Sequence, residues 1–285
     1  MSRRVGEIVP ALTARLSAAG CAEARLDARL LVAGALDIPP MTVFSRPERE
    51  LTPEEEARLD VMASQREARQ PMAQILGRRD FWTMTFAVSP ATLDPRPDSE
   101  TLIEAAMELF PDRSAPLRVL DLGTGTGCLL LSVLSEYPQA TGLGIDLSPE
   151  ALAVANRNLQ TLGFAGRAQM RPGNWYDGIT DRFDLVLSNP PYIPAGDIAG
   201  LEPEVRQWEP LSALVGGEDG LDCYRLLAAG VGGVLKPGGV VLWEVGAGQA
   251  ASAGALLAKA GLTVLEPRRD LGGIDRCVRA LCAAQ

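Results

Sequence analysis

The 285-residue chain contains no histidine. This absence excludes a Ser-His-Asp or Cys-His catalytic unit, any imidazole base and the common histidine zinc sites. Any chemistry here therefore works without an imidazole. The 5 cysteines are odd in number, are scattered, and lack the paired spacing of a metal site: Cys21, Cys128, Cys223, Cys277 and Cys282. Such a set is typical of reduced thiols in a cytoplasm rather than of a disulfide framework.

Positive charge is also scarce, and no long apolar run is present. Lys and Arg number 27 against 36 Asp and Glu, which gives a net charge of −9, and no segment is rich in Lys or Arg. Proteins that track duplex nucleic acid usually cluster Lys and Arg to neutralise phosphates, so nucleic acid is the less favoured substrate. The start of the chain lacks a secretory signal, and no run approaches the roughly 20 apolar residues that span a bilayer. We expect a cytoplasmic protein that does not engage a membrane.

The N-terminal part of the chain has the pattern of a small helical domain. Apolar residues at helical spacing predict helices over 5–16 and 22–36. A third helix begins at Thr52, where Pro53 suits the first helical position and Glu55 completes a capping box. The length of the chain leaves room for such a domain beside a larger one.

The pattern changes after this helical part, and we expect a division into residues 1–78, 79–97 and 98–285. Residues 79–88 of the middle part are rich in strand-forming residues and predict a hairpin or a linker ribbon, so we expect 79–97 to be a β-hairpin linker. In the last part, helical patterns separate strands predicted over 117–120, 141–145, 183–187 and 240–245, with a turn at 236–239 before the last. This alternation predicts an α/β fold with a doubly wound, mostly parallel sheet. Ligands of such sheets bind at the carboxyl ends of the strands.

A glycine-rich loop follows the first of these strands. Its candidate cofactor-binding residues are Asp121, Gly123, Thr124, Gly125, Thr126 and Gly127. Alternate glycines let the backbone bend sharply and approach a ligand closely. The spacing is G-x-G-x-G rather than the G-x-G-x-x-G of a dinucleotide site. Taken alone, the loop indicates a nucleotide-binding fold with an unassigned cofactor.

Asp146 ends the next predicted strand. A carboxylate there can accept hydrogen bonds from both hydroxyls of a ribose, although the same residue could instead cap the helix that begins near Pro149. Together with the glycine loop, Asp146 favours S-adenosylmethionine as the cofactor. Asn174 and Trp175 follow the third strand region, where the indole could pack on adenine and the amide could meet its polar edge. A tryptophan in the plain core is the alternative.

The tetrapeptide Asn189-Pro190-Pro191-Tyr192 follows the strand over 183–187. Two prolines cannot continue a central strand, and Pro190 restricts Asn189 to an extended backbone. The Asn189 side-chain oxygen and the Pro190 carbonyl can then accept both N–H groups of an amide or amino nitrogen, a poor nucleophile, while Tyr192 stacks on the planar group. No strong base is needed, because the nitrogen can lose its proton late. A strand-ending turn without chemistry is the alternative.

Taken together, these motifs resemble the S-adenosylmethionine-dependent N-methyltransferases, and more closely the protein-(glutamine-N5) methyltransferases that modify peptide chain release factors. The resemblance covers nearly the whole chain and includes, besides the residues above, Gln74–Gly77, Phe81-Trp82, Pro95–Glu100, Glu209-Pro210, Ala213-Leu214, Gly217–Leu221 and Asp270–Gly273 before Arg276. The tetrapeptide is shared with adenine-N6 methyltransferases acting on DNA, so the Pro95–Glu100 segment and the helical domain favour the glutamine enzymes. Two residues depart from the family pattern: Asn174 stands where relatives often carry Asp, and Asp94 where an apolar residue is usual.

The resemblance implies a Rossmann-like sheet of seven strands, the last antiparallel. It also implies methyl transfer from S-adenosylmethionine to N5 of the glutamine in the Gly-Gly-Gln motif of class 1 release factors, by direct in-line displacement, with the helical domain helping to engage the release factor. The candidate substrate residues are Asn189, Pro190, Pro191 and Tyr192; Asp146, Asn174, Trp175 and Asn189 join the glycine loop as candidate cofactor residues. Arg96 and Glu100 could belong to the site or form a surface salt bridge and a helix cap. Two other functions stay open: an adenine-N6 methyltransferase acting on nucleic acid, and a non-catalytic module that binds the cofactor or a partner.

Overall fold

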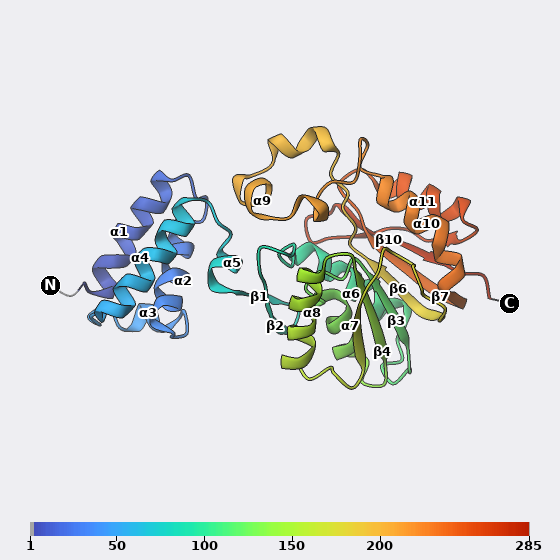
Figure 1. Cartoon of the computed structure of the whole chain (residues 1–285), viewed down its shortest axis with the longest axis horizontal. Coiled ribbons are helices and arrows are strands. Elements are labelled where there is room, and N and C mark those ends of the chain that lie inside the picture. The colour runs from blue at the N-terminus through green and yellow to red at the C-terminus, as the bar shows by residue number, and fades with distance from the viewer. Residues whose placement is uncertain (1–2, 285) are drawn as a thin grey trace. The chain divides into compact units, whose positions relative to one another are not determined.

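The computed structural model describes residues 3–284, and the chain divides into two compact units (Figure 1). The first unit comprises Met1–Gly77 together with Glu202–Trp208, and the second comprises Arg78–Leu201 and Glu209–Gln285. The three-part division at residues 78 and 97 stays a prediction, since the hairpin falls within the second unit and Glu202–Trp208 within the first. None of the helices within residues 3–284 has the length and apolar character of a membrane span.

The first unit is helical. Its helices are α1 (Val5–Ala18), α2 (Ala24–Leu36), α3 (Thr42–Ser45), α4 (Pro53–Glu67), α5 (Met72–Leu76) and α9 (Pro203–Trp208). Leu12 and Leu16 of α1, Leu31 of α2 and Leu59 of α4 are buried in one core, which follows from their helical spacing. The helices predicted over 5–16 and 22–36 are confirmed, with the second starting two residues later.

Helix α4 begins with the capping box that the sequence predicts. The Thr52 hydroxyl accepts a hydrogen bond from the Glu55 N–H (3.2 Å), and the Glu55 carboxylate accepts one from the Thr52 N–H (3.0 Å). Replacing Thr52 by alanine should lower the free energy of unfolding by about 1 kcal/mol, because the Glu55 N–H loses its acceptor. Urea unfolding followed by helical circular dichroism measures this loss, and Thr52→Ser, which keeps the hydroxyl, is the matched control. An unchanged midpoint in Thr52→Ala would contradict the stabilising role of the cap.

The segment Glu202–Trp208 belongs to the helical unit although it lies far along the chain. The Arg69 guanidinium donates to both carboxylate oxygens of Glu204 (2.6 and 2.6 Å), and Arg66 donates to Glu204 at 2.9 Å. Arg66 is buried and also donates to Asp27 (2.8 Å). The Trp208 indole donates to the Ala68 carbonyl (3.2 Å). Because Arg66 and Glu204 are largely withdrawn from water, breaking this pair would leave a poorly solvated charge.

The second unit is built on a mixed sheet. Its strands are β3 (Arg118–Leu122), β4 (Thr141–Asp146), β5 (Ala168–Pro172), β6 (Phe183–Ser188), β7 (Leu235–Glu244), β8 (Thr263–Val264), β9 (Arg268–Arg269) and β10 (Asp275–Leu281). They lie in the order β5-β4-β3-β6-β7-β10-β8, with β9 also paired to β10. The pairs from β5 to β7 are parallel, and β10 is antiparallel to β7. The prediction that the last strand of the chain is antiparallel is confirmed, but the sheet has eight strands rather than the predicted seven, because β9 also pairs with β10.

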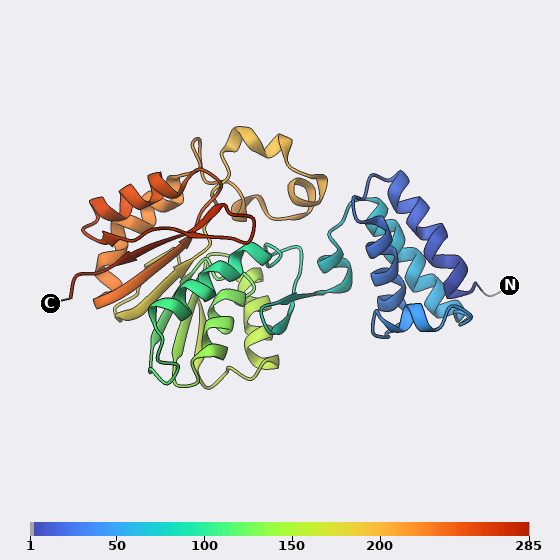
Figure 2. The same cartoon turned by 180° about the vertical axis from the view of Figure 1, so that it is seen from behind.

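Helices cover both faces of this sheet (Figures 1 and 2). One face packs on α6 (Glu100–Leu109), α7 (Cys128–Glu136) and α8 (Pro149–Thr161), and the other on α10 (Asp222–Val234) and α11 (Ala250–Lys259). Alternate residues of β3 enter opposite cores: Val119 joins the first, and Leu120 and Leu122 join the second. Because a strand buried on both faces tends to be apolar throughout rather than alternating, a short apolar run predicted this strand over 117–120.

The hairpin and the short 3-10 helices complete the second unit. They are β1 (Arg78–Phe81), β2 (Met84–Ala87), η1 (Pro97–Ser99), η2 (Ala195–Gly200) and η3 (Leu211–Ala213). The hairpin predicted within residues 79–88 is confirmed.

One predicted turn is wrong. Residues Lys236–Gly239 lie inside β7 rather than before a strand, because pairing with β6 resumes on both sides of them. The register passes from Phe183 opposite Leu235 to Leu185 opposite Val240, so the pairing of β7 with β6 is irregular over Lys236–Gly239. Gly238 has a φ of +75°, which a glycine adopts without strain.

The parallel arrangement determines where the candidate residues meet. Because β4, β3 and β6 are neighbours running in one direction, their carboxyl ends lie at the same edge of the sheet. Asp146 ends β4, the glycine loop follows β3, and Asn189 follows β6. Three motifs that are separated in the sequence thus border one edge.

Candidate active site

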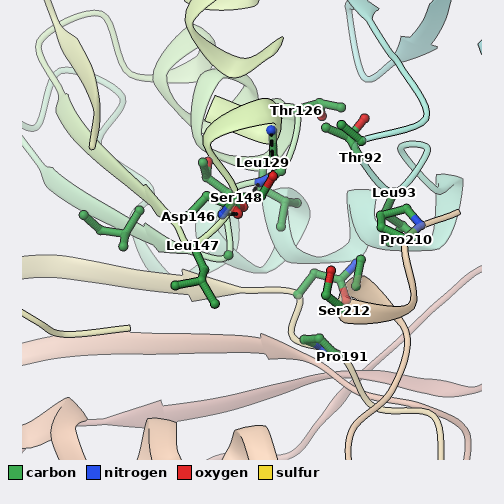
Figure 3. Close-up of a pocket in the computed structure, with 18 of the residues that line it drawn as sticks. Thr92, Leu93, Thr126, Leu129, Asp146, Leu147, Ser148, Pro191, Pro210 and Ser212 are labelled. Atoms are coloured by element: carbon green, nitrogen blue, oxygen red, sulfur yellow. Dashed lines mark hydrogen bonds between the residues drawn. The ribbon is translucent and has the colours of Figure 1, made fainter. Parts of the chain in front are cut away.

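A cavity of about 410 Å³ lies at this edge, a size that suits a small-molecule ligand. Figure 3 shows Asp146, Leu147 and Ser148 on one side of it, and Thr92, Leu93 and Pro210 on the other. The predicted site residues that line it are Gly123, Thr124, Gly125, Thr126, Asp146, Asn174, Trp175, Asn189 and Pro191. The predicted residues that do not line it are Asp121, Gly127, Pro190 and Tyr192.

The glycine loop bends because its glycines occupy left-handed backbone conformations. Gly123, Gly125 and Gly127 have φ values of +72°, +55° and +81°. The N–H groups of Gly123 and Thr124 both donate to the Ile145 carbonyl (2.9 and 2.9 Å), which fastens the loop to β4. A Cβ placed on Gly125 would meet no atom within 4 Å. The loop therefore leaves open space where a ligand can approach its backbone.

Asp146 faces the cavity with a carboxylate that the backbone orients. One oxygen accepts from the Gly125 N–H (2.8 Å) and the other from the Ser148 N–H (2.9 Å). The cap of α8 is Ser148, whose hydroxyl accepts from the Ala151 N–H (3.0 Å), so Asp146 does not cap that helix. A carboxylate has about four lone-pair sites, so acceptor capacity remains for hydroxyl groups of a ligand.

Asp121 lies beneath the loop rather than in the cavity wall. One carboxylate oxygen accepts from the Thr124 hydroxyl (2.6 Å), and the other is buried without a hydrogen-bond partner in the described part of the chain. Burial raises the pKa of Asp121 to about 7. The side chain thus holds Thr124 in the loop from below.

Trp175 lines the cavity in an unusual backbone conformation. Its φ is +51°, which is uncommon for a residue other than glycine and is found mainly where the surroundings enforce it. A Cβ on Gly123 would lie 3.8 Å from the indole, so the ring stands against the glycine loop. Asn174 also lines the cavity and is exposed. The arrangement offers a flat apolar surface beside the loop.

The tetrapeptide is held by contacts on both sides. The Asn189 side-chain nitrogen donates to the Ser99 hydroxyl (3.3 Å), and Pro190 is buried. The Tyr192 hydroxyl donates to Glu244 (3.3 Å), and its main-chain carbonyl accepts from the Gln249 side chain (2.8 Å). Burial raises the pKa of Tyr192 above its usual range. Asn189 and Pro191 thus reach the cavity, whereas Tyr192 is anchored outside its lining.

Sequence reasoning missed Ser99 and Glu244, which support the tetrapeptide. The Ser99 hydroxyl, at the end of η1, donates to Glu244 at 2.5 Å. Glu244, the last residue of β7, is 1% exposed, and burial raises its pKa to about 7. A partial signal was present, because Glu244 is an acidic residue near the end of the strand predicted over 240–245, and it ends β7 as Asp146 ends β4. Ser99 lies in the Pro95–Glu100 segment of the family resemblance, but no local pattern indicated its contact with Glu244, which is 145 positions away.

Gly216 packs directly on the tetrapeptide. A Cβ there would lie 2.7 Å from the Pro191 carbonyl oxygen and 2.8 Å from the Tyr192 Cα, and both are backbone atoms that cannot rotate away. We expect Gly216→Ala to lower the free energy of unfolding by about 1–3 kcal/mol through overpacking. Urea unfolding measures the effect against Gly196→Ala, whose Cβ would meet no atom within 4 Å. Equal stability of the two variants would contradict the close packing at residue 216.

Arg96 and Glu100 both make structural contacts. Arg96 donates to both carboxylate oxygens of buried Glu209 (2.8 and 2.6 Å), and Glu100 accepts from the Trp82 N–H (2.7 Å). Burial raises the pKa of Glu209 to about 7. Asp94 is buried in the cavity wall, and one of its carboxylate oxygens has no hydrogen-bond partner among the residues that the structure describes. Burial raises the pKa of Asp94.

The charges of the cavity do not form a basic channel. Of the described residues that line it, the charged ones are Asp94, Arg96 and Asp146, and the single cation is paired with Glu209. A groove for a nucleic acid backbone needs clustered cations, so this lining does not favour that substrate. Across residues 3–284, no cluster of Cys, Asp and Glu side chains is arranged to hold a metal ion.

Comparison with known proteins gives matches along most of the chain. A family model described as the PrmC N-terminal domain matches residues 7–77, and one described as the methyltransferase small domain matches residues 97–199. A release factor glutamine methyltransferase from Rhodospirillum rubrum is 47% identical over 266 residues, covering 93% of this chain and 81% of that protein. One from Cereibacter sphaeroides is 47% identical over 278 residues, covering 97% and 98%. Among solved structures, a ribosomal protein L11 methylase from Lactobacillus delbrueckii subsp. bulgaricus matches with a TM-score of 0.50 and 17% identity, covering 68% of this chain and 82% of that one, which supports the fold alone.

Proposed function

The chain belongs to the release factor glutamine methyltransferase family, a class of S-adenosylmethionine-dependent enzymes, and from this premise we propose its reaction and its site residues. It transfers a methyl group from S-adenosylmethionine to N5 of the glutamine in the Gly-Gly-Gln motif of class 1 peptide chain release factors. The observation that carries the proposal is a single cavity lined by the glycine loop, Asp146 and Asn189.

The residues present fit this cofactor. The loop over Gly123–Gly127 leaves its backbone open to a ligand, Asp146 keeps lone pairs for the ribose hydroxyls, and Trp175 offers a surface for adenine. Asn174 would meet the polar edge of the base. When bound, the cofactor supplies an electrophilic methyl group carried on sulfur.

Asn189 and Pro190 would hold the glutamine amide. The Asn189 nitrogen is already bonded to Ser99, so its side-chain oxygen remains to accept a substrate N–H. The Pro190 carbonyl would accept the second N–H, and Pro191 stiffens the bend. The contact of Tyr192 with the substrate stays a prediction, and its anchored hydroxyl keeps the ring from rotating freely. Acceptors placed in this way orient a weak nucleophile and stabilise the positive charge that develops on it.

The reaction needs no imidazole. An amide nitrogen becomes strongly acidic once it gains the methyl group, and its proton then leaves to water without a strong base. This agrees with a chain that contains no histidine. The helical unit is proposed to engage the release factor outside the cavity.

Labelled S-adenosylmethionine incubated with the full chain and a purified class 1 release factor tests the proposal. We expect one methyl group on the glutamine of the Gly-Gly-Gln motif, located by mass mapping of the peptide, and none on a release factor with glutamate at that position. Duplex DNA and RNA serve as parallel substrates. Label on nucleic acid alone would favour an adenine-N6 methyltransferase, and cofactor binding without any transfer would favour a binding module; either result rejects the proposed reaction.

A further inference from the structure

The side-chain amide of Asn189 has two ends of opposite hydrogen-bonding character. Its oxygen only accepts hydrogen bonds and its nitrogen only donates them. The proposed reaction needs the oxygen to face the substrate N–H. A rotation that exchanges the two ends would turn the amide nitrogen, a donor, toward the substrate N–H, which is also a donor. A neighbouring residue that binds only the nitrogen end would therefore fix the productive orientation.

Ser99 is this neighbour. The Asn189 nitrogen donates to the Ser99 oxygen at 3.3 Å, and the Ser99 hydroxyl donates its proton to Glu244 at 2.5 Å. A hydroxyl has a single proton. Once that proton is directed to Glu244, Ser99 presents only lone pairs to Asn189, and these attract the amide nitrogen and repel the amide oxygen.

Glu244 keeps the Ser99 proton directed away from Asn189. Its two carboxylate oxygens accept from different hydroxyls, one from Ser99 and the other from Tyr192 at 3.3 Å. The main-chain carbonyl of Glu244 accepts from the Tyr224 hydroxyl at 2.8 Å, which fixes the end of β7. An ionised carboxylate has no proton to donate, so the direction of each bond is determined.

We propose that Ser99 and Glu244 are positioning residues that hold the Asn189 carboxamide with its oxygen toward the substrate amide. The inference rests on the proposed function. According to this inference, Ser99 and Glu244, which lie outside the tetrapeptide, determine which end of the Asn189 amide faces the substrate. Neither residue needs to touch the glutamine for this role.

The orientation of the Asn189 carboxamide therefore depends on the ionisation of Glu244. Burial raises its pKa to about 7, so the carboxylate is an acceptor above that pH and becomes a donor below it. A protonated Glu244 can donate to Ser99, which frees the Ser99 proton to face Asn189 and removes the preference. Besides Ser99, the titratable and charged groups that act on Glu244 are Asp98, Cys128, Tyr192, Tyr224, Arg276 and Cys277.

Kinetics of Ser99 variants test the inference through the reaction. In Ser99→Ala we expect kcat for release-factor methylation to fall about tenfold, with the KM for the release factor and the Kd for S-adenosylmethionine unchanged, because one orienting hydrogen bond is lost. Ser99→Thr keeps the hydroxyl and should restore kcat. Ser132→Ala is the matched control, since Ser132 is also buried but its hydroxyl has no hydrogen-bond partner among residues 3–284.

A double-mutant cycle separates positioning from simple damage to the fold. Because Ser99 acts through Asn189, Ser99→Ala should have no further effect on single-turnover rates in the Asn189→Ala background. An equal loss in both backgrounds, or wild-type kcat in Ser99→Ala, would overturn the proposal.

A nuclear magnetic resonance readout decides the inference even if release factors are not substrates. The Asn189 side-chain NH₂ signals, assigned by their loss in Asn189→Asp, should show one proton protected from solvent exchange above the pKa of Glu244. Protection should disappear in Ser99→Ala, persist in Ser132→Ala, and decline in the wild type as the pH falls through about 7. Equal exchange in the wild type and Ser99→Ala, or protection that does not change with pH, would overturn the positioning role. If the signals behave as expected but no methylation occurs, only the proposed function is rejected.

Discussion

Replacement of Asn189 by alanine is expected to lower kcat for glutamine methylation by about 10²–10³-fold, the usual cost of removing one preorganised group that stabilises developing charge. The variant loses the acceptor that aims the substrate nitrogen. The Kd for S-adenosylmethionine should change little, because the glycine loop and Asp146 bond to each other without Asn189. Single-turnover methylation of a release factor and calorimetric cofactor binding measure the two quantities.

The control for this variant is Asn156→Ala, which removes an exposed asparagine on α8 whose side chain donates to the Leu152 carbonyl of the same helix. It should keep wild-type kcat and Kd. If Asn189→Ala also turned over at the wild-type rate, the role assigned to the tetrapeptide would be wrong. If it lost cofactor affinity instead, Asn189 would act mainly on the cofactor.

Replacement of Asp146 by alanine should raise the Kd for S-adenosylmethionine by about 100-fold, since hydrogen bonds to a charged carboxylate contribute about 1.5–3 kcal/mol each. The change removes the acceptor proposed for the ribose and also frees the Gly125 N–H from its partner. Asp146→Asn keeps one acceptor but loses the charge, so its Kd for S-adenosylmethionine should lie between those of the wild type and Asp146→Ala. Isothermal titration calorimetry without any substrate measures the affinity.

Asp181→Ala is the matched control, because Asp181 is exposed and its ion pair with Arg118 lies on the surface. Exposed pairs contribute little, so its Kd should equal that of the wild type. An unchanged Kd in Asp146→Ala would show that the ribose is held elsewhere.

Local chemistry explains which parts of this fold the sequence could predict. The capping box of α4 involves residues three positions apart, and the bend after β6 follows from two prolines, so both can be read without tertiary information. The same holds for the glycine loop, whose positive φ values require glycine. Their meeting at one edge follows from parallel strands, which the alternation of elements predicts.

Features that depend on distant partners could not be predicted in this way. The anchoring of Tyr192 on Glu244 moves its hydroxyl away from the cavity lining, and no local pattern records that pairing. The irregular stretch Lys236–Gly239 has the composition of a turn, and only the pairing of β7 with β6 on both sides of it shows that it lies within a strand. The assignment of Glu202–Trp208 to the helical unit depends on Arg66 and Arg69, which lie far away in the sequence.

The assignment of Glu202–Trp208 to the helical unit limits where the chain can be divided. The boundary at residue 77 looks like a place to separate a catalytic fragment from its helical partner, but the helical unit also includes Glu202–Trp208. A fragment that starts at Arg78 would keep Glu204 and Trp208 without the arginines and the carbonyl that bind them. The two units are therefore not interchangeable modules. Gene fusion or truncation at a single junction would separate Glu202–Trp208 from the rest of the helical unit. Any transfer of the helical unit to another protein would have to preserve both pieces of the chain that compose it.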